Sequence, residues 1–379
     1  MFFPLRRCSR AGLMVALDIG SRQTKVVAAS WADGCVAVKA AESSATPPGT
    51  VEEQGLNDPA RAAALLRDIA EAAGVVGCRA FSAIGGRHVI VRTVTTRPLP
   101  REDALDAARI EAAKLLPMPF QEAAIVVQLL PGADAGSEGR WSRALVIAAP
   151  KSLVERHAEC MELAGLEPAG LDAIQLALLR ALKGTPSANL WQGHPWAIVA
   201  LGASTTELLV AEGGTPAFCR TLAWGTNRLS AAAGRNDAET TARGTEGLGI
   251  SWEGDVGEDG RILRGEARRS AGLATLAAEI QRSLIYYQMQ FPEGSYRGVV
   301  GRIVLSGGGA AIPGMREYLE RQLDTSVQVG DPLMHLEARV EPQAFRALNA
   351  YPTAFAPCLG LIARGDELNG TDPCDEQIN

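Results

Sequence analysis

The sequence predicts an α/β protein built from two related lobes, and three observations support this prediction. A strand–turn–strand pattern over Val15–Ala28 occurs again, with a similar succession of apolar and small residues, over Ile198–Val210. Each copy is followed by a third strand-like segment, at Cys35–Glu42 and Ala217–Leu222. Helix-like and strand-like segments lie between the copies, as in layered α/β folds. Because two such hairpins with flanking strands seldom arise by chance, we interpret them as copies of one unit.

Length, charge and cysteine content narrow the class of protein. A chain of 379 residues is too long for one ordinary core and suits two lobes or several subdomains. The formal net charge of -6 gives no broad attraction to nucleic acid or anionic lipid, so we expect no nucleic-acid partner. The 7 cysteines include no CxxC pair, which favours free thiols in a reducing cytosol over a disulfide framework. No run of about 18 apolar residues occurs, so we expect no membrane span.

The folded chain is expected to begin with the strand that Met14 opens. Residues 1–13 carry arginines after a short apolar start and lack the apolar stretch and cleavage site of a signal peptide. We interpret them as an N-terminal extension of the kind that a mis-assigned start codon adds; a basic membrane anchor is the alternative. Residues 14–85 then form the first part of the first lobe, with a helix over Ala60–Ala73 that Asp58 caps.

Residues 86–168 are interpreted as a compact β/α insertion with its own small core. We expect its strands at Val89–Val94, Ala124–Leu130 and Ala144–Ala148, and an amphipathic helix over Arg101–Leu116. The apolar face of that helix is predicted to comprise Leu105, Ala108, Ala112 and Leu115.

Residues 169–194 are expected to return to the first lobe and to connect it with the second. Helices are predicted at Leu153–Ala164 and Leu171–Leu182, and the second of these is apolar enough to be buried. The repeated hairpin then occupies 195–232, the first part of the second lobe.

The remainder of the second lobe is predicted to be less regular. Residues 233–300 begin with a polar stretch, Ala233–Ser270, in which we expect a long mobile loop, and continue with a helix over Leu273–Gln290. Residues 301–364 hold a strand, a glycine-rich turn and a helix that Pro313 opens. We interpret 365–379 as a disordered acidic tail.

The glycine-rich turns suggest a phosphate-binding site. A turn of glycine and hydroxyl residues exposes backbone N–H groups with little obstruction, which is what phosphate oxygens require. Asp18, at the end of a strand, has the chemistry to hold hydrated Mg²⁺, and Lys25 can neutralise phosphate charge. The turn Ser306–Gly309 precedes a helix and offers a second anion site.

Other nucleotide and catalytic motifs are absent from the sequence. No GxxxxGK[ST] pattern and no GxGxxG between a strand and a helix occurs, which disfavours a P-loop and a dinucleotide site. The 4 histidines are isolated, without HExxH or metal-ligand spacing, and no GxSxG is present. We therefore expect each histidine to be a hydrogen-bonded core or surface residue.

Three motifs give the chain a resemblance to a known superfamily. Asp18–Lys25, Leu201–Glu207 and Leu305–Gly309 are similar to the phosphate-1, phosphate-2 and adenosine motifs of the actin/Hsp70/FtsA superfamily. Within it, the chain resembles the PilM family of type IV pilus assembly proteins most, on the segments Ile110–Phe120 and Leu284–Tyr287. The resemblance extends from Met14 to about Arg364.

This resemblance implies an actin-like fold, a duplicated RNase H-like arrangement of two lobes with ATP and Mg²⁺ between them. As in FtsA, an insertion of the 1C type would replace actin subdomain 1B. The corresponding assignments are 14–85 and 169–194 to subdomain 1A, 86–168 to 1C, 195–232 to 2A, 233–300 to 2B, and 301–364 to 2A with a return to 1A.

The resemblance also implies a partner. It would be the cytoplasmic N-terminal peptide of a PilN-like inner-membrane protein, bound in a groove that involves subdomains 1A and 1C, together with other inner-membrane components of the pilus. The chain would then be cytoplasmic and peripheral at the inner membrane through this partner. Its role would be that of a scaffold and not of an enzyme.

This chain departs from the superfamily pattern at two places. Ala200 stands where the second phosphate turn normally has an aspartate, and loss of that carboxylate should weaken hydrolysis. The Glu-x-x-Lys helix that contacts adenosine keeps Glu239 but has Ala242 at the lysine position. By the resemblance, the nucleotide contacts are Asp18, Gly20, Ser21, Lys25, Gly202, Ala203, Ser204, Glu239, Gly307, Gly308 and Gly309, with Mg²⁺ held by Asp18 through water.

Two other functions share this fold. A small-molecule kinase of the acetate and sugar kinase type needs an acidic base over a substrate cleft, and no recognisable motif supplies one. A filament-forming cell-division protein like FtsA usually ends in an amphipathic membrane helix, and Asp366–Asn379 lacks apolar periodicity. The pilus scaffold is therefore the favoured interpretation.

Overall fold

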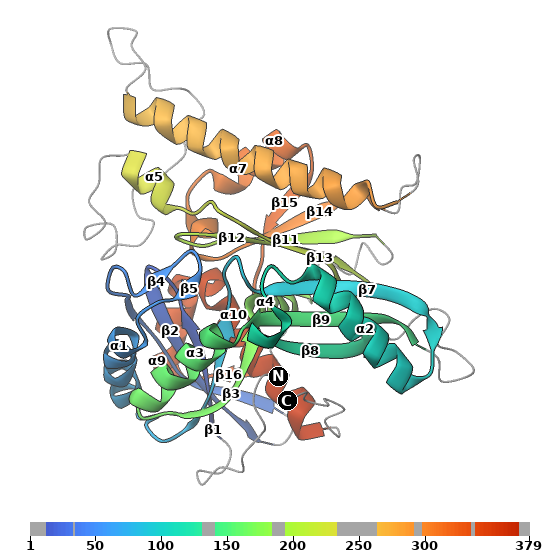
Figure 1. The fold of residues 1–379 in the computed structure, drawn as a ribbon. Coiled ribbons are helices and arrows are strands. Elements are labelled where there is room, and N and C mark those ends of the chain that lie inside the picture. The colour runs from blue at the N-terminus through green and yellow to red at the C-terminus, as the bar shows by residue number, and fades with distance from the viewer. Residues whose placement is uncertain are drawn as a thin grey trace, which may run out of the picture.

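The computed structural model describes residues 13–32, 35–130, 141–183, 194–232, 264–291, 298–334 and 338–370, which form two lobes (Figure 1). In the described ranges, the first lobe holds a six-stranded sheet in the order β10-β6-β1-β2-β3-β16 and the second a five-stranded sheet in the order β13-β12-β11-β14-β15. The strands of the first sheet are β1 (Leu13–Ile19), β2 (Gln23–Ala32), β3 (Cys35–Ala45), β6 (Arg79–Ile84), β10 (Glu167–Ala173) and β16 (Ala338–Val340). Those of the second are β11 (Trp196–Leu201), β12 (Thr206–Glu212), β13 (Thr215–Leu222), β14 (Arg302–Ser306) and β15 (Ser326–Val329).

The two sheets share one topology. In the first, β1 pairs antiparallel with β2 and parallel with β6, while β3 and β10 extend the two sides. In the second, β11 pairs antiparallel with β12 and parallel with β14, while β13 and β15 extend the two sides. The repeated hairpin of the sequence is thus a repeated half-domain, and the predicted two-lobed α/β fold is confirmed.

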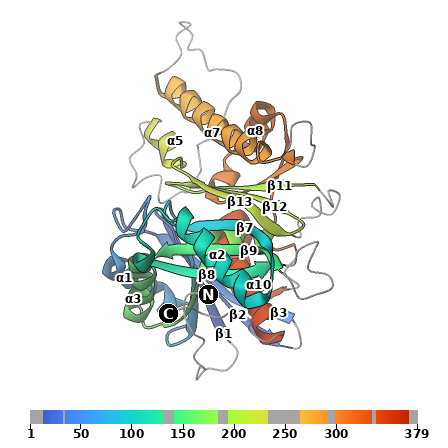
Figure 2. The same cartoon turned by 45° about the vertical axis from the view of Figure 1, so that its right-hand side comes forward.

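A separate three-stranded antiparallel sheet, in the order β7-β9-β8, lies between β6 and β10 in the chain. It consists of β7 (Ile90–Leu99), β8 (Ala123–Leu130) and β9 (Trp141–Pro150). Helix α2 (Arg101–Leu115) lies across it, as Figure 2 shows, and buries Leu105, Ala108 and Ala112 against the strands. Leu115 was predicted to belong to this face but is 42% exposed, at the residue where the helix ends.

Helices cover both main sheets. α7 and α8 lie on the side of the second sheet that faces away from the first lobe (Figure 1). Asp58 accepts a hydrogen bond from the backbone N–H of Arg61 and caps α1, as predicted. The helices of the first lobe are α1 (Pro59–Ala72), α3 (Lys151–Leu163), α4 (Ile174–Leu182), α9 (Pro342–Ala350) and α10 (Ala356–Gly370). Those of the second are α5 (Asn227–Ala232), α7 (Arg264–Gln288) and α8 (Met315–Leu323). The short elements are β4 (Val51–Glu52), β5 (Gly55–Leu56), and the 3₁₀ turns η1 (Phe120–Glu122), η4 (Gly308–Ala311) and η5 (Pro352–Phe355).

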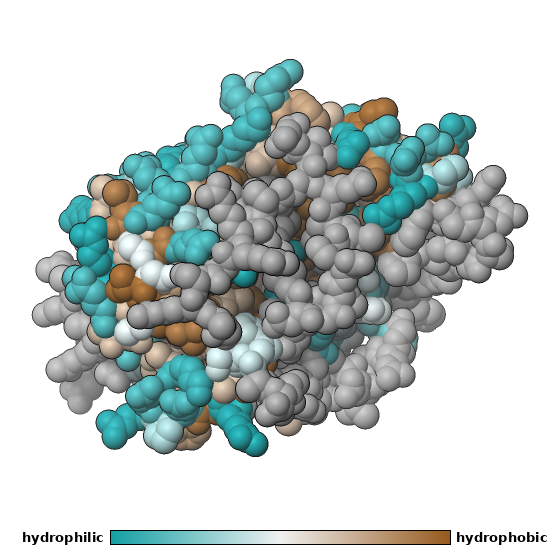
Figure 3. Space-filling model, turned by 90° about the horizontal axis from the view of Figure 1, so that it is seen from below, coloured by the Kyte–Doolittle hydropathy of each residue, from teal (hydrophilic) through white to brown (hydrophobic). Residues whose placement is uncertain are grey.

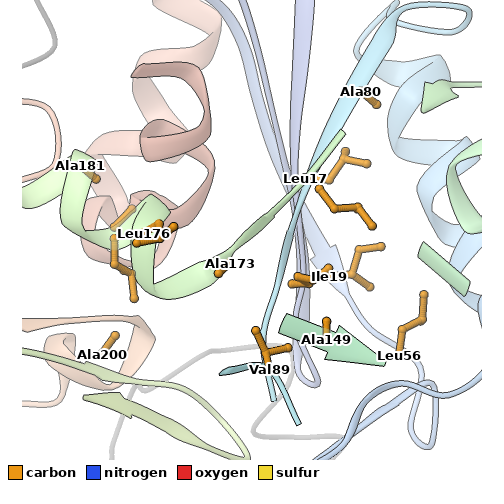
Figure 4. Packing of buried hydrophobic residues seen from close by; sticks show 14 of the residues in the cluster. Leu17, Ile19, Leu56, Ala80, Val89, Ala149, Ala173, Leu176, Ala181 and Ala200 are labelled. Atoms are coloured by element: carbon orange, nitrogen blue, oxygen red, sulfur yellow. The ribbon is translucent and has the colours of Figure 1, made fainter. Parts of the chain in front are cut away.

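The largest hydrophobic cluster crosses from one lobe to the other. It joins Leu17 and Ile19 of β1 with Leu176 of α4 and with Ala200 and Val304 of the second sheet. Figure 4 shows side chains of this cluster from all three regions. Because α4 packs between the two sheets, the lobes share part of one core rather than meeting only at their surfaces.

Three segments differ from the sequence predictions. Leu171–Ala173 belongs to strand β10, so the buried helix begins only at Ile174. α7 starts at Arg264, inside the stretch expected to be a loop, and α10 continues to Gly370, inside the expected tail. In the last two cases a helix extends into polar sequence, because adding residues to a formed helix costs little. The rest of the expected loop (233–263), the N-terminal residues 1–12 and the end of the tail (371–379) lie outside the described residues.

No helix in the described part of the chain is long and apolar enough to cross a membrane. Figure 3 shows the molecule from below the view of Figure 1, and the described residues on this face are a mixture of hydrophilic and hydrophobic ones. Cys78, Cys160, Cys219 and Cys358 are buried free thiols.

The close packing of α10 on α4 allows a direct test of the fold. A Cβ on Gly360 would lie 1.8 Å from the carbonyl oxygen of Ala177, so α10 and α4 cannot both stay in place if Gly360 gains a methyl group. We expect Gly360→Ala to lower the free energy of unfolding by about 2 kcal/mol or more, measured by urea denaturation. Gly272→Ala in α7 is the matched control, because its Cβ meets only Leu229 Cδ2, at 3.8 Å, among the described residues. It should be neutral or stabilising by up to about 1 kcal/mol. Equal stability of the two variants would contradict this packing.

Candidate functional site

A cavity of about 200 Å³ lies between the two lobes, at the ends of the paired hairpins. It is bordered by the β1–β2 turn, the β11–β12 turn and the turn that follows β14. Of the residues proposed from the sequence, those that line it are Asp18, Gly20, Ser21, Lys25, Gly202, Ala203, Ser204, Gly307, Gly308 and Gly309. Glu239 lies outside the described residues. The structure therefore brings together in one place ten residues that the sequence distributes over both lobes.

The two hairpin turns have the same geometry. The N–H of Gly20 donates to the carbonyl of Gln23 over 3.1 Å, and the N–H of Gly202 donates to that of Thr205 over 3.0 Å. A Cβ on either glycine would lie 2.9 or 2.7 Å from the same carbonyl oxygen. Both turns therefore require glycine, because the backbone has to pass this close to itself.

The third turn packs against the second hairpin. Gly307 has φ +78°, and a Cβ there would lie 2.5 Å from the carbonyl oxygen of Leu201. A Cβ on Gly309 would meet Leu201 Cβ at 2.5 Å, whereas one on Gly308 would have no neighbour within 4 Å in the described ranges. Gly307 and Gly309 are thus fixed by packing, while the backbone at Gly308 is open. This is the arrangement that an anion-binding turn needs.

Asp18 and Lys25 face each other across the first hairpin. Lys25 Nζ donates to Asp18 Oδ2 over 2.8 Å. The side chain of Asp18 is 12% exposed and that of Lys25 is 11% exposed. Each charge compensates the other, which is what allows both to be so deeply buried. The small exposed fraction of both side chains faces the cavity.

The turns of opposite lobes touch each other beside the cavity. Ser204 Oγ lies 2.8 Å from Ser21 Oγ, and Arg22 donates to Asn227 Oδ1 at the start of α5. These contacts join the two loops directly. Sequence reasoning missed Arg22 and Asn227, since they are separated by 205 positions and belong to no motif.

The pair of facing residues behind the second turn differs from the pair behind the first. Ala200 is paired with Glu207 across β11 and β12, at the register of the pair Asp18–Lys25 in β1 and β2. The carboxylate that the sequence lacks at Ala200 therefore has a counterpart on the facing strand. Sequence reasoning gave Glu207 no role, although it follows Ala200 at the interval by which Lys25 follows Asp18.

His157 of α3 also borders the cavity. Its Nδ1 lies 3.0 Å from Ser82 Oγ, which confirms the expectation that it is a hydrogen-bonded core histidine. Burial, with the nearby Arg156, lowers the pKa of His157 to about 4, so the ring is neutral at physiological pH.

The residues present fit a hydrated Mg²⁺ better than a metal bound by protein ligands alone. In the ranges described, no three His, Cys, Asp or Glu side chains are grouped as such a site requires. Asp18 supplies one carboxylate oxygen beside an anion-binding turn, and Mg²⁺ commonly keeps several waters and takes its other ligands from phosphates.

The chain matches a family model described as type IV pilus assembly protein PilM over residues 16–249 and 270–365. It is similar to a solved PilM-PilN type IV pilus biogenesis complex, with 23% identity and a TM-score of 0.76 over 93% of this chain and 98% of that chain. It is also similar to MreB 5 of Spiroplasma citri bound to AMPPNP, with 12% identity and a TM-score of 0.52 over 95% of this chain and 98% of that chain. No curated protein matches the chain. The chain has the actin-like fold and belongs to the type IV pilus assembly protein PilM family.

Proposed function

We propose that this chain is a nucleotide-binding scaffold of type IV pilus assembly that docks the cytoplasmic N-terminal peptide of a PilN-like inner-membrane protein. The observation that carries the nucleotide site is the convergence of three glycine-rich turns and the Asp18–Lys25 pair on one cavity between the lobes. Support for the partner comes from the fold shared with the PilM-PilN complex. Through that partner, the chain would lie at the cytoplasmic face of the inner membrane.

The subdomain assignment made from the sequence is part of this proposal. It divides the first lobe into 1A (14–85 and 169–194) and 1C (86–168). The three-stranded sheet with α2, which has its own hydrophobic cluster, supports 1C as a separate unit. In the second lobe, 195–232 and the first part of 301–364 form 2A and 233–300 forms 2B, while the rest of 301–364 returns to 1A.

In the proposed site, backbone N–H groups of the three turns bind the phosphates of ATP. Lys25 would neutralise part of their charge, and Asp18 would hold a hydrated Mg²⁺. When bound, Mg²⁺ supplies charge neutralisation of the phosphate oxygens. Glu239 stays a proposed adenosine contact.

Hydrolysis is a separate question from binding. Ala200 lines the cavity with a methyl group where an acid would position water, and Glu207 is engaged by neighbouring donors. We propose that the chain binds ATP and turns it over slowly or not at all, so that the nucleotide serves to hold the two lobes together.

Asp18 gives the first test of this site. We expect Asp18→Ala to abolish the dependence of ATP affinity on Mg²⁺ and to lower the affinity in the presence of Mg²⁺ by at least about tenfold. Titration calorimetry with and without Mg²⁺ measures both.

Asp18→Asn keeps the shape of the side chain and should show the same loss, which separates the effect of charge from that of packing. Glu341→Gln, at a partly exposed ion pair with Lys39, is the control that should bind as wild type does. Unchanged Mg²⁺ dependence in both Asp18 variants would mean that this carboxylate does not hold the metal.

Ala200 gives the second test. Its register matches that of Asp18, so Ala200→Asp places a carboxylate at the end of β11, facing the cavity. We expect phosphate release from ATP to rise by about tenfold or more over wild type, because a water-orienting acid is restored. Ala200→Asn, with the same shape and no charge, should stay at the wild-type rate. Equal rates in all three proteins would mean that slow turnover does not arise from this position.

The partner is tested by pull-down with the cytoplasmic N-terminal peptide of a PilN-like protein from the same organism. The peptide should retain the full-length protein, and a scrambled peptide of the same composition should not. An extended peptide of this kind binds through main-chain hydrogen bonds and side-chain pockets, so the order of its residues matters. No retention, together with measurable phosphorylation of a sugar or acetate, would favour the kinase alternative.

A further inference from the structure

The wall of the cavity contains a buried carboxylate that the proposed function does not use. Glu207 is 6% exposed and lines the cavity from the second lobe. Its Oε2 accepts a hydrogen bond from Gln175 Nε2 over 2.7 Å and another from Thr221 Oγ1 over 2.7 Å. The Gly85–Gly86 turn lies beside its other oxygen, since a Cβ on Gly85 would be 3.8 Å from Glu207 Oε1, and the backbone of Gly86 stabilises the charged carboxylate.

The residues around this carboxylate, Thr221, Gln175 and Gly86, come from both lobes. Thr221 belongs to β13, the neighbour of β12 in the second sheet. Gln175 belongs to α4, and Gly86 to the turn between β6 and β7, both in the first lobe. The equivalent side chain of the first hairpin, Lys25, pairs instead with Asp18 inside its own lobe. Glu207 is therefore the member of the duplicated pair that reaches across the cleft.

The turn that Glu207 holds is itself tightly constrained. Gly86 has φ +110°, and a Cβ there would lie 3.1 to 3.2 Å from backbone atoms of Glu53 and Gln54. Beyond the turn, β7 continues the contact between the lobes, since Thr93 Oγ1 donates to the carbonyl of Pro216 over 2.5 Å. Arg92 donates to the carbonyl of Cys219 on the same strand, β13. A displacement of Glu207 from Gly86 would thus be transmitted to the start of the inserted sheet.

We propose that Glu207 is a positioning residue whose carboxylate holds the Gly85–Gly86 turn and α4 of the first lobe against the second lobe, and so sets the width of the cleft. This inference rests on the proposed function only in naming what the cleft holds. The contacts themselves exist without a ligand.

The charge of this carboxyl group changes near neutral pH. Burial raises the pKa of Glu207 to about 7, although the hydrogen bonds from Thr221, Gln175 and Gly86 oppose the rise. Glu207 interacts electrostatically with Cys219 of β13, which also interacts with Arg92 of β7. The other charged or titratable residues that line the shared cavity are Asp18, Arg22, Lys25, Glu52, Glu53, His157 and Tyr351. Gln175 of α4 carries no charge.

Three substitutions separate the contacts of Glu207 across the cleft from the charge of its carboxyl group. Glu207→Gln keeps the length and an accepting oxygen, and its new N–H group can donate to Gln175. Gln175 Oε1 is buried and has no hydrogen-bond partner among the described residues, so the amide can turn over to accept that bond. Glu207→Ala removes these contacts. Glu207→Asp shortens the side chain by one methylene and serves if the alanine variant does not fold.

Hydrogen exchange of the ligand-free full-length protein is the first measurement. We expect the Gly86 amide to exchange about tenfold or more faster in the alanine and aspartate variants and within about twofold of wild type in the glutamine variant. Peptides from α10 should not change in any of them. Wild-type protection at Gly86 in both shortened variants would overturn the proposal, and so would an equal loss of protection throughout the chain.

The second measurement is the melting temperature of wild type and Glu207→Gln between pH 5 and pH 8. Between pH 4.5 and about 7 the folded wild type holds a proton that the unfolded chain has released. Stability from this group is therefore present at low pH and is lost as the pH rises through 7. The melting temperature of wild type should fall relative to the glutamine variant by a few °C across this window. A constant difference would show that Glu207 does not titrate in this window and that pH does not control its contacts across the cleft.

The ATP titrations described for Asp18 distinguish the two proposals. Wild-type protein that binds no ATP, yet shows the expected exchange and pH behaviour, would refute the nucleotide site and leave the role of Glu207 in place. If wild-type protein binds ATP and all Glu207 variants keep the wild-type protection of the Gly86 amide, the nucleotide site would stand and the role of Glu207 would be refuted.

Discussion

The cleft depends on the close approach of one backbone segment to another at three glycines. At Gly20, Gly202 and Gly307 a Cβ would lie 2.9, 2.7 and 2.5 Å from a carbonyl oxygen, so any other residue would push the segments apart. The first two close the hairpins, and the third holds the turn after β14 on the second hairpin. The N–H groups of these three glycines are bonded to carbonyls, whereas neighbouring turn residues such as Ser21, Ser204 and Gly308 also line the cavity. The restriction that shapes the fold thus also places turn backbone where an anion can bind.

Much of this arrangement can be predicted from the sequence, because it is encoded locally and encoded twice. A hairpin with a glycine turn has a recognisable pattern of apolar and small residues, and its repetition after Ile198 indicates a second lobe. A duplicated fold of this kind requires the turns to face each other, so the sequence alone suffices to assign Asp18, Lys25 and Gly308 to one cavity, and all three line it.

What the sequence does not reveal is the set of contacts between distant segments. Arg22 and Asn227 are 205 positions apart, and Glu207 meets Gln175 across 32 positions; neither pair belongs to a pattern of fixed spacing. The ends of elements are missed for a different reason. Leu171 and Ala173 continue into the apolar run of the helix after them with only Asp172 between, so periodicity does not separate strand β10 from α4. Only pairing with β6 assigns these residues to the sheet.

The two halves of the molecule have kept their backbone and changed their side chains. The glycine turns are equivalent in both lobes, since substitution there would disrupt the hairpins themselves. The facing pair behind each turn is under no such restriction: Asp18 and Lys25 form an ion pair within one lobe, while Ala200 leaves Glu207 to bond across the cleft. An acid that would position water at Ala200 serves catalysis, whereas a carboxylate that binds Gln175 and Gly86 serves the attachment of one lobe to the other. The second hairpin has therefore retained the backbone geometry suited to phosphate, and its buried acid is used to hold the lobes together. In the proposed scaffold function the closed form has to persist, and this distribution of polar groups would favour that outcome over turnover.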